Sequence, residues 1–367
     1  TGLTMTNKKF NNLFGQKPRN PKSEKLTQFH MDIAASIQKV TEDIMIKLAK
    51  SAQKEYGLKN LCLAGGVALN CVANGKILNE KIFENIWVQP AAGDAGGAVG
   101  AALALWHIDQ KNPRNINNQD DMSGSYLGPE YSQSEIEKEL NRLGAKFKIL
   151  NESEIINQTS LDLSSGNAVG WFQGRMEFGP RALGCRSILG NPKSQDMQKN
   201  LNLKIKYRES FRPFAPSILA EELSNWFDMN SSSPYMLMVS NIKKEKCLKM
   251  TENDQKLFGI EKLNVKRSEV PAITHVDYSA RIQTVHKHTN NKYHQLLSKF
   301  KEITGCPILV NTSFNVRGEP IVNSPTDAFN CFMGTELDYL VIGNCILDKN
   351  KQDQNLKKDY TKEFDLD

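Results

Sequence analysis

VGWFQGRMEFGPRALGCRSILGNPKSQDMQKNLNLKIKYRESFRPFAPS, residues 169–217, combines cations with glycine, proline and large aromatic side chains. A solvated run of charge contains few such residues, so we expect the backbone here to be bent and folded inward. Arginine offers phosphate a planar bidentate fork, and lysine offers a point charge. The stretch therefore predicts a rigid site for a phosphate ester, although a structural network of ion pairs would use the same residue types. Its cations include Arg175, Arg181, Arg186, Lys204, Lys206, Arg208 and Arg212.

A second informative segment, GCPILVNTSFNVRGEPIVNSP, covers residues 305–325. Its apolar run at 308–310 predicts a buried strand. Small polar residues at the exit of a strand are typical of a turn that binds a ligand. An ordinary turn is the alternative, because Asn, Ser and Gly are common turn formers. The residues that follow the apolar run include Asn311, Thr312, Ser313, Asn315 and Arg317.

Together the two segments resemble a known family. Lys206-Tyr207-Arg208 and Ser313-Phe314-Asn315 match the KxR and SxN pair of YrdC-like domains, which form carbamoyl-adenylate. The strings GRMEFGPRALGCRSIL, FRPFAPS and NTSFNVRGEPIV resemble the O-carbamoyltransferases typified by nodulation protein U and the cephamycin carbamoyltransferase. One segment, HVDYSARIQTV at 275–285, departs from the family, where Gly-Thr is expected in place of Tyr278-Ser279. Arg281 in that segment remains a candidate phosphate ligand.

The resemblance implies a reaction in two stages. Carbamoyl phosphate and ATP first give carbamoyl-adenylate, and the carbamoyl group then passes to a hydroxyl of a small-molecule or sugar acceptor. Fixed positive charge in a dry site suits this chemistry. The implied catalytic residues are Lys206, Arg208, Ser313 and Asn315. The implied ligands of carbamoyl phosphate and ATP are Arg181, Arg212, Arg281, Asn311 and Arg317.

The amino-terminal part carries two similar units. Residues 60–75, NLCLAGGVALNCVANG, predict a strand, a glycine turn and a helix whose first amide groups could face a phosphate. The alternative is that the two glycines form an ordinary turn without a ligand. Residues 86–105, IWVQPAAGDAGGAVGAALAL, repeat this order. Neither unit contains Gly-Lys-Ser/Thr, which excludes a Walker P-loop. The two units resemble the carboxy-terminal half of an actin-like, sugar-kinase-like ATPase domain.

That second resemblance implies further site residues. The nucleotide ligands would be Gly65, Gly66 and Asn70, and Asp94 would bind a divalent metal, iron or magnesium. An acid that favours a helix dipole is the alternative for Asp94. In the family the domain begins upstream, with histidine metal ligands there, so we expect this chain to be truncated at its amino terminus. We also expect the remaining lobe to expose apolar surface. The chain as a whole is expected to perform only the first half-reaction, in the YrdC-like domain.

Composition limits the remaining classes of function. The net charge is +6, which is below that expected of a dedicated nucleic-acid binder. Seven scattered cysteines without CxxC favour reduced thiols in a cytoplasmic protein. No apolar run approaches the ~20 residues that span a bilayer. The histidines at 286, 288 and 294 lack a paired acid or cysteine at ligand spacing, so they are a weak zinc signal. A homodimer is compatible with the composition.

The predicted fold class is α/β. A partial actin-like lobe is expected at 1–110, a polar linker at 111–125, a YrdC-like domain with a twisted mixed sheet at 126–348 and a polar tail at 349–367. Helical spacing predicts a helix over 31–56 that ends at Gly57, and Ser132 with Glu135 predicts a capping box. We also predict strands at 146–150 and 168–172, helices at 195–206 and 326–334, and a surface excursion at 242–265.

The resulting hypothesis is an ATP-dependent O-carbamoyltransferase with carbamoyl phosphate, ATP and a hydroxyl compound as partners. Two alternatives use the same residues. A threonylcarbamoyl-adenylate synthase-like enzyme of tRNA modification shares KxR and SxN. A non-catalytic RNA-binding module would use the same basic concavity, with steeply salt-dependent affinity.

Overall fold

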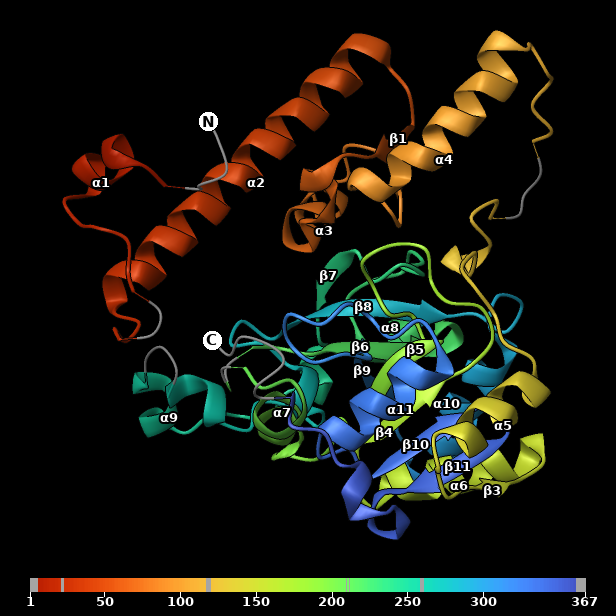
Figure 1. Ribbon diagram of the computed structural model, residues 1–367. Coiled ribbons are helices and arrows are strands. Elements are labelled where there is room, and N and C mark those ends of the chain that lie inside the picture. Colours follow the sequence, from red (N-terminus) through yellow and green to blue (C-terminus); the bar gives the residue numbers. More distant parts are fainter. Residues whose placement is uncertain are drawn as a thin grey trace.

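The computed structural model describes residues 6–20, 23–116, 120–208, 210, 212–257 and 261–360. Two sheets organise them, a two-stranded parallel sheet in the first part and a nine-stranded mixed sheet in the second. Figure 1 shows the small sheet and its helices above the large one. The predicted α/β class and the mixed sheet are confirmed, while the actin-like and YrdC-like assignments stay expectations.

The first part contains one long helix and two short strand–helix units. Predicted residues 31–56 lie within α2, which ends where Gly57 adopts a φ of 63°, as expected. The apolar residues of its predicted face are largely exposed, among them Ile37 at 62% and Leu48 at 64%. Together with Leu61 and Val67, this helix lines an apolar groove of about 520 Å³. The elements are α1 (Lys8–Phe14), α2 (Gln28–Tyr56), β1 (Asn60–Leu63), α3 (Cys71–Asn79), β2 (Asn85–Val88) and α4 (Asp94–Ala104).

The large sheet has the strand order β3-β11-β10-β4-β5-β9-β6-β8-β7. Pairs β10–β4 and β6–β8 are parallel, and the other neighbours are antiparallel. The strands are β3 (Lys148–Ile149), β4 (Val169–Phe172), β5 (Arg186–Gly190), β6 (Ala215–Leu219), β7 (Met238–Asn241), β8 (Ser279–Val285), β9 (Ile308–Ser313), β10 (Tyr339–Ile342) and β11 (Cys345–Asp348).

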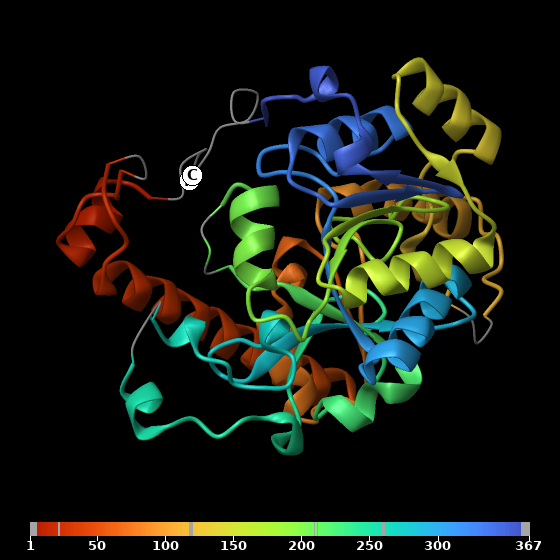
Figure 2. The same ribbon diagram turned by 90° about the horizontal axis from the view of Figure 1, so that it is seen from below.

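Helices cover both faces of this sheet. In Figure 2, α11 and α5 lie on one side, and α6 and α10 pack together on the other. The Ser132–Glu135 capping box opens α5, as predicted. The helices are α5 (Gln133–Arg142), α6 (Glu152–Ser164), α7 (Met197–Asn200), α8 (Leu223–Trp226), α9 (Glu252–Lys256), α10 (Asn291–Thr304) and α11 (Pro325–Gly334).

Close backbone contacts join the first part to the large sheet. Helix α3 packs on β7, where a β-carbon at Gly75 would overlap the Val239 carbonyl oxygen. Asn74 Nδ2 donates to Leu237 O at 3.0 Å across the same contact. At Gly179, which has a φ of 138°, a β-carbon would lie 2.8 Å from Pro90 O. The main apolar core accordingly includes Ala68, Val88 and Ala92 of the first part.

Several predicted elements differ from the observed ones. Strand β9 continues to Ser313, so Asn311–Ser313, expected in a turn, belong to the strand. The helix predicted at 195–206 is α7 followed by a wider, π-helical turn at Leu201–Ile205. The predicted strand 146–150 is shortened to β3. Residues 242–257, 261–263 and 265 are mostly exposed or half-buried, whereas Gln352 and Tyr360 of the predicted tail are buried. Residues 258–260 and 361–367 lie outside the described residues.

Among the residues that the structure describes, no helix combines the length and the apolar character needed to cross a lipid bilayer.

Candidate active site

Lys206 stands at the end of the π-helical turn and points into the protein with 3% of its surface exposed. Its ammonium donates to Ser313 Oγ at 3.1 Å and to both Asn315 Oδ1 and Asn315 O at 2.8 Å. It also contacts Ser313 O. The structure therefore brings together three of the four predicted catalytic residues, although Lys206 lies more than a hundred positions before Ser313 and Asn315 in the chain.

Burial controls the charge of Lys206. The pKa of Lys206 is lowered to about 7, mainly because burial removes hydration and secondly because the Arg208 charge is near. Cys331 and Glu319 act in the other direction and raise the pKa. The Lys206 ammonium therefore loses its proton more easily than that of an exposed lysine. Arg208, the fourth predicted catalytic residue, donates from Nε to Asn202 Oδ1 at 2.7 Å, and its guanidinium lies 5.0 Å from the centre of the Phe214 ring.

The turn that follows β9 is held by a carboxylate. Glu319 Oε2 accepts from Val316 N at 2.8 Å, and Glu319 O accepts from Asn315 Nδ2 at 2.6 Å. Arg317 joins the site through its backbone, with its amide donating to Lys206 O at 3.3 Å. Sequence analysis did not single out Glu319, although a carboxylate directly after Gly318 in a turn was a usable signal.

A second cationic cluster forms where the first part meets the large sheet. Burial, followed by the charge of Arg281, lowers the pKa of Arg181 to about 10. Burial also lowers the pKa of Arg281, and the Cys71 thiol, which is hydrogen-bonded to that guanidinium, partly offsets the effect. Cys71 is the first residue of α3, so the first part of the chain contributes to this cluster. Sequence analysis assigned no role to Cys71.

Buried polar side chains hold the loop that carries Arg181. Glu177 Oε1 accepts from Leu183 N at 2.6 Å and Cys185 N at 2.8 Å, and burial raises the pKa of this carboxyl. Asn311 Nδ2 donates to Ala182 O at 3.1 Å. Asn311 is 1% exposed and also bonds Ser217 and Gln283, so its amide supports the loop from inside the protein.

Strand β9 relates the two clusters to each other. Asn311 supports the Arg181 loop, and Ser313, two residues later on the same face of the strand, contacts Lys206. Arg212 is linked to Arg208 through its backbone, because its carbonyl oxygen accepts a hydrogen bond from Asn202 Nδ2 at 2.9 Å and Asn202 Oδ1 accepts one from Arg208. Lys206 and Arg208 thus form one cationic group and Arg181 and Arg281 form another, and strand β9 contacts both Lys206 and the loop that carries Arg181.

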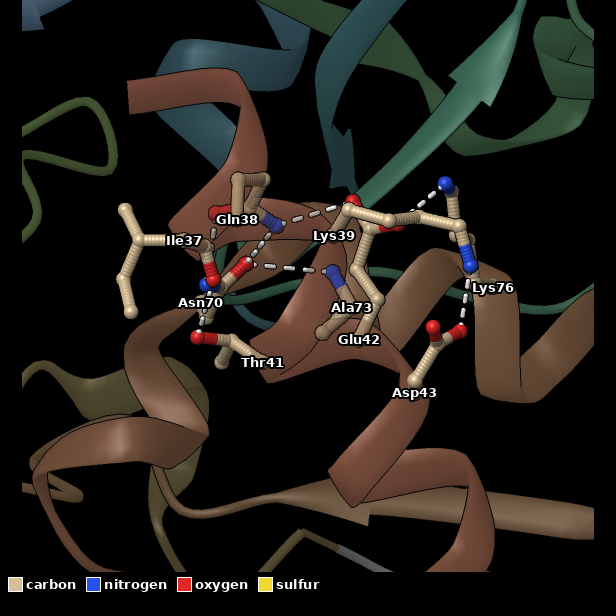
Figure 3. A network of polar contacts seen from close by, with 9 residues as sticks. All are labelled: Ile37, Gln38, Lys39, Thr41, Glu42, Asp43, Asn70, Ala73 and Lys76. Carbon is tan, nitrogen blue, oxygen red and sulfur yellow. Dashed lines mark hydrogen bonds and ion pairs between the residues drawn. The ribbon is translucent and has the colours of Figure 1, made fainter. Parts of the chain in front are cut away.

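In the first part, Asn70 acts as the amino-terminal cap of α3. Asn70 Oδ1 accepts from Ala73 N at 3.1 Å, and its amide exchanges hydrogen bonds with the Gln38 amide of α2. Gln38 also donates to Glu42, which pairs with Lys76, as Figure 3 shows. Gly65 has a φ of 94°, and Gly66 opens the short 3₁₀ turn Gly66–Leu69 that precedes Asn70. These contacts fix the end of α3 at which Cys71 faces the arginines.

No metal site is complete within the described part of the chain. Asp94 is exposed and begins α4, and no three His, Cys, Asp or Glu side chains there cluster in a way that could hold an ion. The metal role of Asp94 stays a prediction. Two of the histidines considered for zinc have other partners: His286 Nε2 lies 2.8 Å from Ser232 Oγ, and His294 Nε2 lies 2.8 Å from Glu221 Oε1.

Comparison with known proteins identifies both parts of the chain. Residues 1–103 match the family described as "Carbamoyltransferase N-terminus", and residues 160–349 match "Carbamoyltransferase C-terminus". A solved structure of full-length HypF in the phosphate- and nucleotide-bound form aligns over 50% of this chain and 20% of its own, at 16% identity and a TM-score of 0.30.

Curated relatives extend the match over most of the chain. The uncharacterized protein sll1178 of Synechocystis is 57% identical over 100% of this chain and 60% of its own length. Nodulation protein NolO of Bradyrhizobium diazoefficiens is 39% identical over 88% of this chain and 55% of its own. Nodulation protein U of Sinorhizobium fredii is 31% identical over 83% and 48%. The chain thus spans about half the length of these relatives, and it belongs to the carbamoyltransferase family.

Proposed function

We propose that the chain is part of an ATP-dependent O-carbamoyltransferase whose adenylate-forming step uses the Lys206 site. The observation that carries the proposal is the contact of the Lys206 ammonium with Ser313 and Asn315. Membership of the carbamoyltransferase family supports it independently.

The proposed chemistry has two stages. Water first cleaves carbamoyl phosphate to carbamate and phosphate. A carbamate oxygen then attacks the α-phosphorus of ATP, and the bond to the bridging oxygen breaks, so that pyrophosphate leaves and carbamoyl-adenylate forms. In the second stage an acceptor hydroxyl attacks the carbamoyl carbon, loses its proton and releases AMP. The first part of the chain, which borders the Arg181 cluster, is assigned to this transfer.

The residues supply charge and orientation. The Lys206 ammonium has three N–H groups and four protein acceptors, so a phosphate oxygen can replace the most distant of them, the Ser313 hydroxyl at 3.1 Å. Asn315 and Ser313 provide donors and acceptors that can orient a carbamoyl group. Arg181 and Arg281 are half-buried cations in mutual proximity, an arrangement that favours a bound polyanion.

The proposed reaction gives no step to a divalent metal. The one predicted metal ligand, Asp94, is an exposed carboxylate at the start of α4, and a single carboxylate does not make a metal site.

Pyrophosphate release from ATP, measured with and without carbamoyl phosphate, tests the proposal. We expect release that depends on carbamoyl phosphate. Release that instead requires bicarbonate and threonine would favour the threonylcarbamoyl-adenylate synthase. A folded protein that releases no pyrophosphate and binds RNA with steep salt dependence would favour the binding module.

A further inference from the structure

The turn after β9 depends on Glu319. One oxygen of its carboxylate accepts from Val316 N at 2.8 Å, and its carbonyl accepts from Asn315 Nδ2 at 2.6 Å. Asn315 Oδ1 in turn accepts from the Lys206 ammonium at 2.8 Å. Glu319 therefore fixes a residue that orients Lys206.

The other carboxylate oxygen of Glu319 is held from the far end of the chain. Glu319 Oε1 accepts from the Tyr360 hydroxyl at 3.2 Å. Tyr360 is 4% exposed, and its ring covers Gly334 at the end of α11, where a β-carbon would lie 2.5 Å from a ring atom. Tyr360 lies beyond residues 160–349, the region that matches the carboxy-terminal family description.

We propose that Tyr360 is a positioning residue of the Lys206 site. Its hydroxyl holds the Glu319 carboxylate, and Glu319 holds the turn at Asn315 and Val316 around the Lys206 ammonium. The catalytic consequence rests on the proposed function, whereas the effect on Lys206 does not.

The charges around Lys206 give this arrangement a measurable signature. Arg208 lowers the Lys206 pKa, while Cys331 and Glu319 raise it. Burial raises the pKa of Glu319, and hydrogen bonds from the Val316 backbone, Cys331 and Tyr360, together with the Lys206 charge, oppose that rise. Removing the Tyr360 hydroxyl should therefore raise the pKa of Glu319 and reduce its negative charge. With less negative charge nearby, the pKa of Lys206 should fall further.

Tyr360→Phe removes the hydroxyl and keeps the ring on Gly334. The pKa of Lys206 is measured by NMR in protein labelled at lysine Cε, with the signal assigned by its loss in Lys206→Met. We expect a downward shift, together with a fall in carbamoyl-phosphate-dependent pyrophosphate release of about three- to tenfold at pH 8. Tyr339→Phe, which removes a hydroxyl from β10, is the matched control and should change neither quantity.

Glu319→Gln should shift the Lys206 titration in the same direction. Because both side chains act through one contact, the double variant should add little to the larger single effect. An unchanged Lys206 titration in Tyr360→Phe, or fully additive shifts, would overturn the positioning role. If the wild-type protein releases no pyrophosphate, the proposed function fails, and the Lys206 titration still decides the role of Tyr360.

Discussion

Lys206 is a buried lysine whose ammonium is surrounded by oxygens of neutral groups. Hydroxyl, amide and carbonyl oxygens stabilise an ammonium less than a carboxylate does, so burial dominates and the pKa falls to about 7. A phosphate would supply the missing negative charge. Protonation of Lys206 and binding of a phosphorylated substrate are therefore coupled at this residue.

Lys206→Ala should remove most of the carbamoyl-phosphate-dependent pyrophosphate release. A phosphate oxygen would lose a charged partner worth roughly 1.5–3 kcal/mol, which is about 10- to 150-fold in rate. Steady-state release at neutral pH measures the effect. Asp94→Ala, which alters an exposed residue of the first part, should leave release unchanged, and equal losses in the two variants would contradict the assignment.

The same lysine should make folding stability depend on pH. Its pKa is about 7 in the folded protein and near the ordinary lysine value of 10.5 in the unfolded chain. Between these values the unfolded chain binds more protons, so the free energy of unfolding should rise with pH. The slope from this group is at most about 1.4 kcal/mol per pH unit. Urea unfolding between pH 7 and 10 should show a smaller slope in Lys206→Met than in the wild type. Identical slopes would show that Lys206 is protonated throughout.

At the scale of helices and strands, short sequence patterns correctly predicted the elements whose ends are set by neighbouring residues. The spacing of apolar residues and Gly57 located α2, and Ser132 with Glu135 located the start of α5. Strand β9 was predicted too short because the polar residue Asn311 looked like part of a turn. Its amide is buried against Ser217 and Gln283, partners that a local pattern does not contain. Tyr360 was missed for the same reason, since its partner Glu319 lies 41 positions away.

Two helical glycines should respond oppositely to alanine. Gly75 of α3 faces the Val239 backbone, which cannot move aside easily, so Gly75→Ala should destabilise the protein by about 1–3 kcal/mol. At Gly97 of α4 an added β-carbon would meet no atom within 4 Å, so Gly97→Ala should stabilise by about 0.5–1 kcal/mol. Urea midpoints measure both. A neutral Gly75→Ala would mean that α3 does not pack this closely on β7.

At the scale of the whole molecule, apolar contacts join the two parts of the chain but leave one face of α2 exposed. The core of the large sheet extends to Ala68 and Val88 of the first part, so the two parts share buried surface. At the same time, Ile44 and Leu48 of α2 remain more than half exposed. The sequence predicted apolar residues on one side of this helix, but the pattern alone could not say whether another element would cover them.

Shared buried surface should make the two parts unfold together. Two of the four tryptophans, Trp87 and Trp106, lie in the first part, and Trp171 and Trp226 lie in the second. A variant with Trp87→Phe and Trp106→Phe reports only on the second part. Its fluorescence transition in urea should coincide with the far-ultraviolet circular dichroism transition of the same variant. Separate midpoints would show that the parts unfold independently.

The packing of α3 on β7 has a consequence for solubility. Strand β7 ends the nine-stranded sheet, and an uncovered end strand can pair with a strand of another molecule. Asn74 donates to the Leu237 carbonyl oxygen just before that strand, and Gly75 packs against the Val239 carbonyl oxygen within it, so α3 shields the strand from such pairing. A shortened chain that kept the large sheet but lacked α3 would present this strand to solvent, and it should form aggregates rich in intermolecular β-structure.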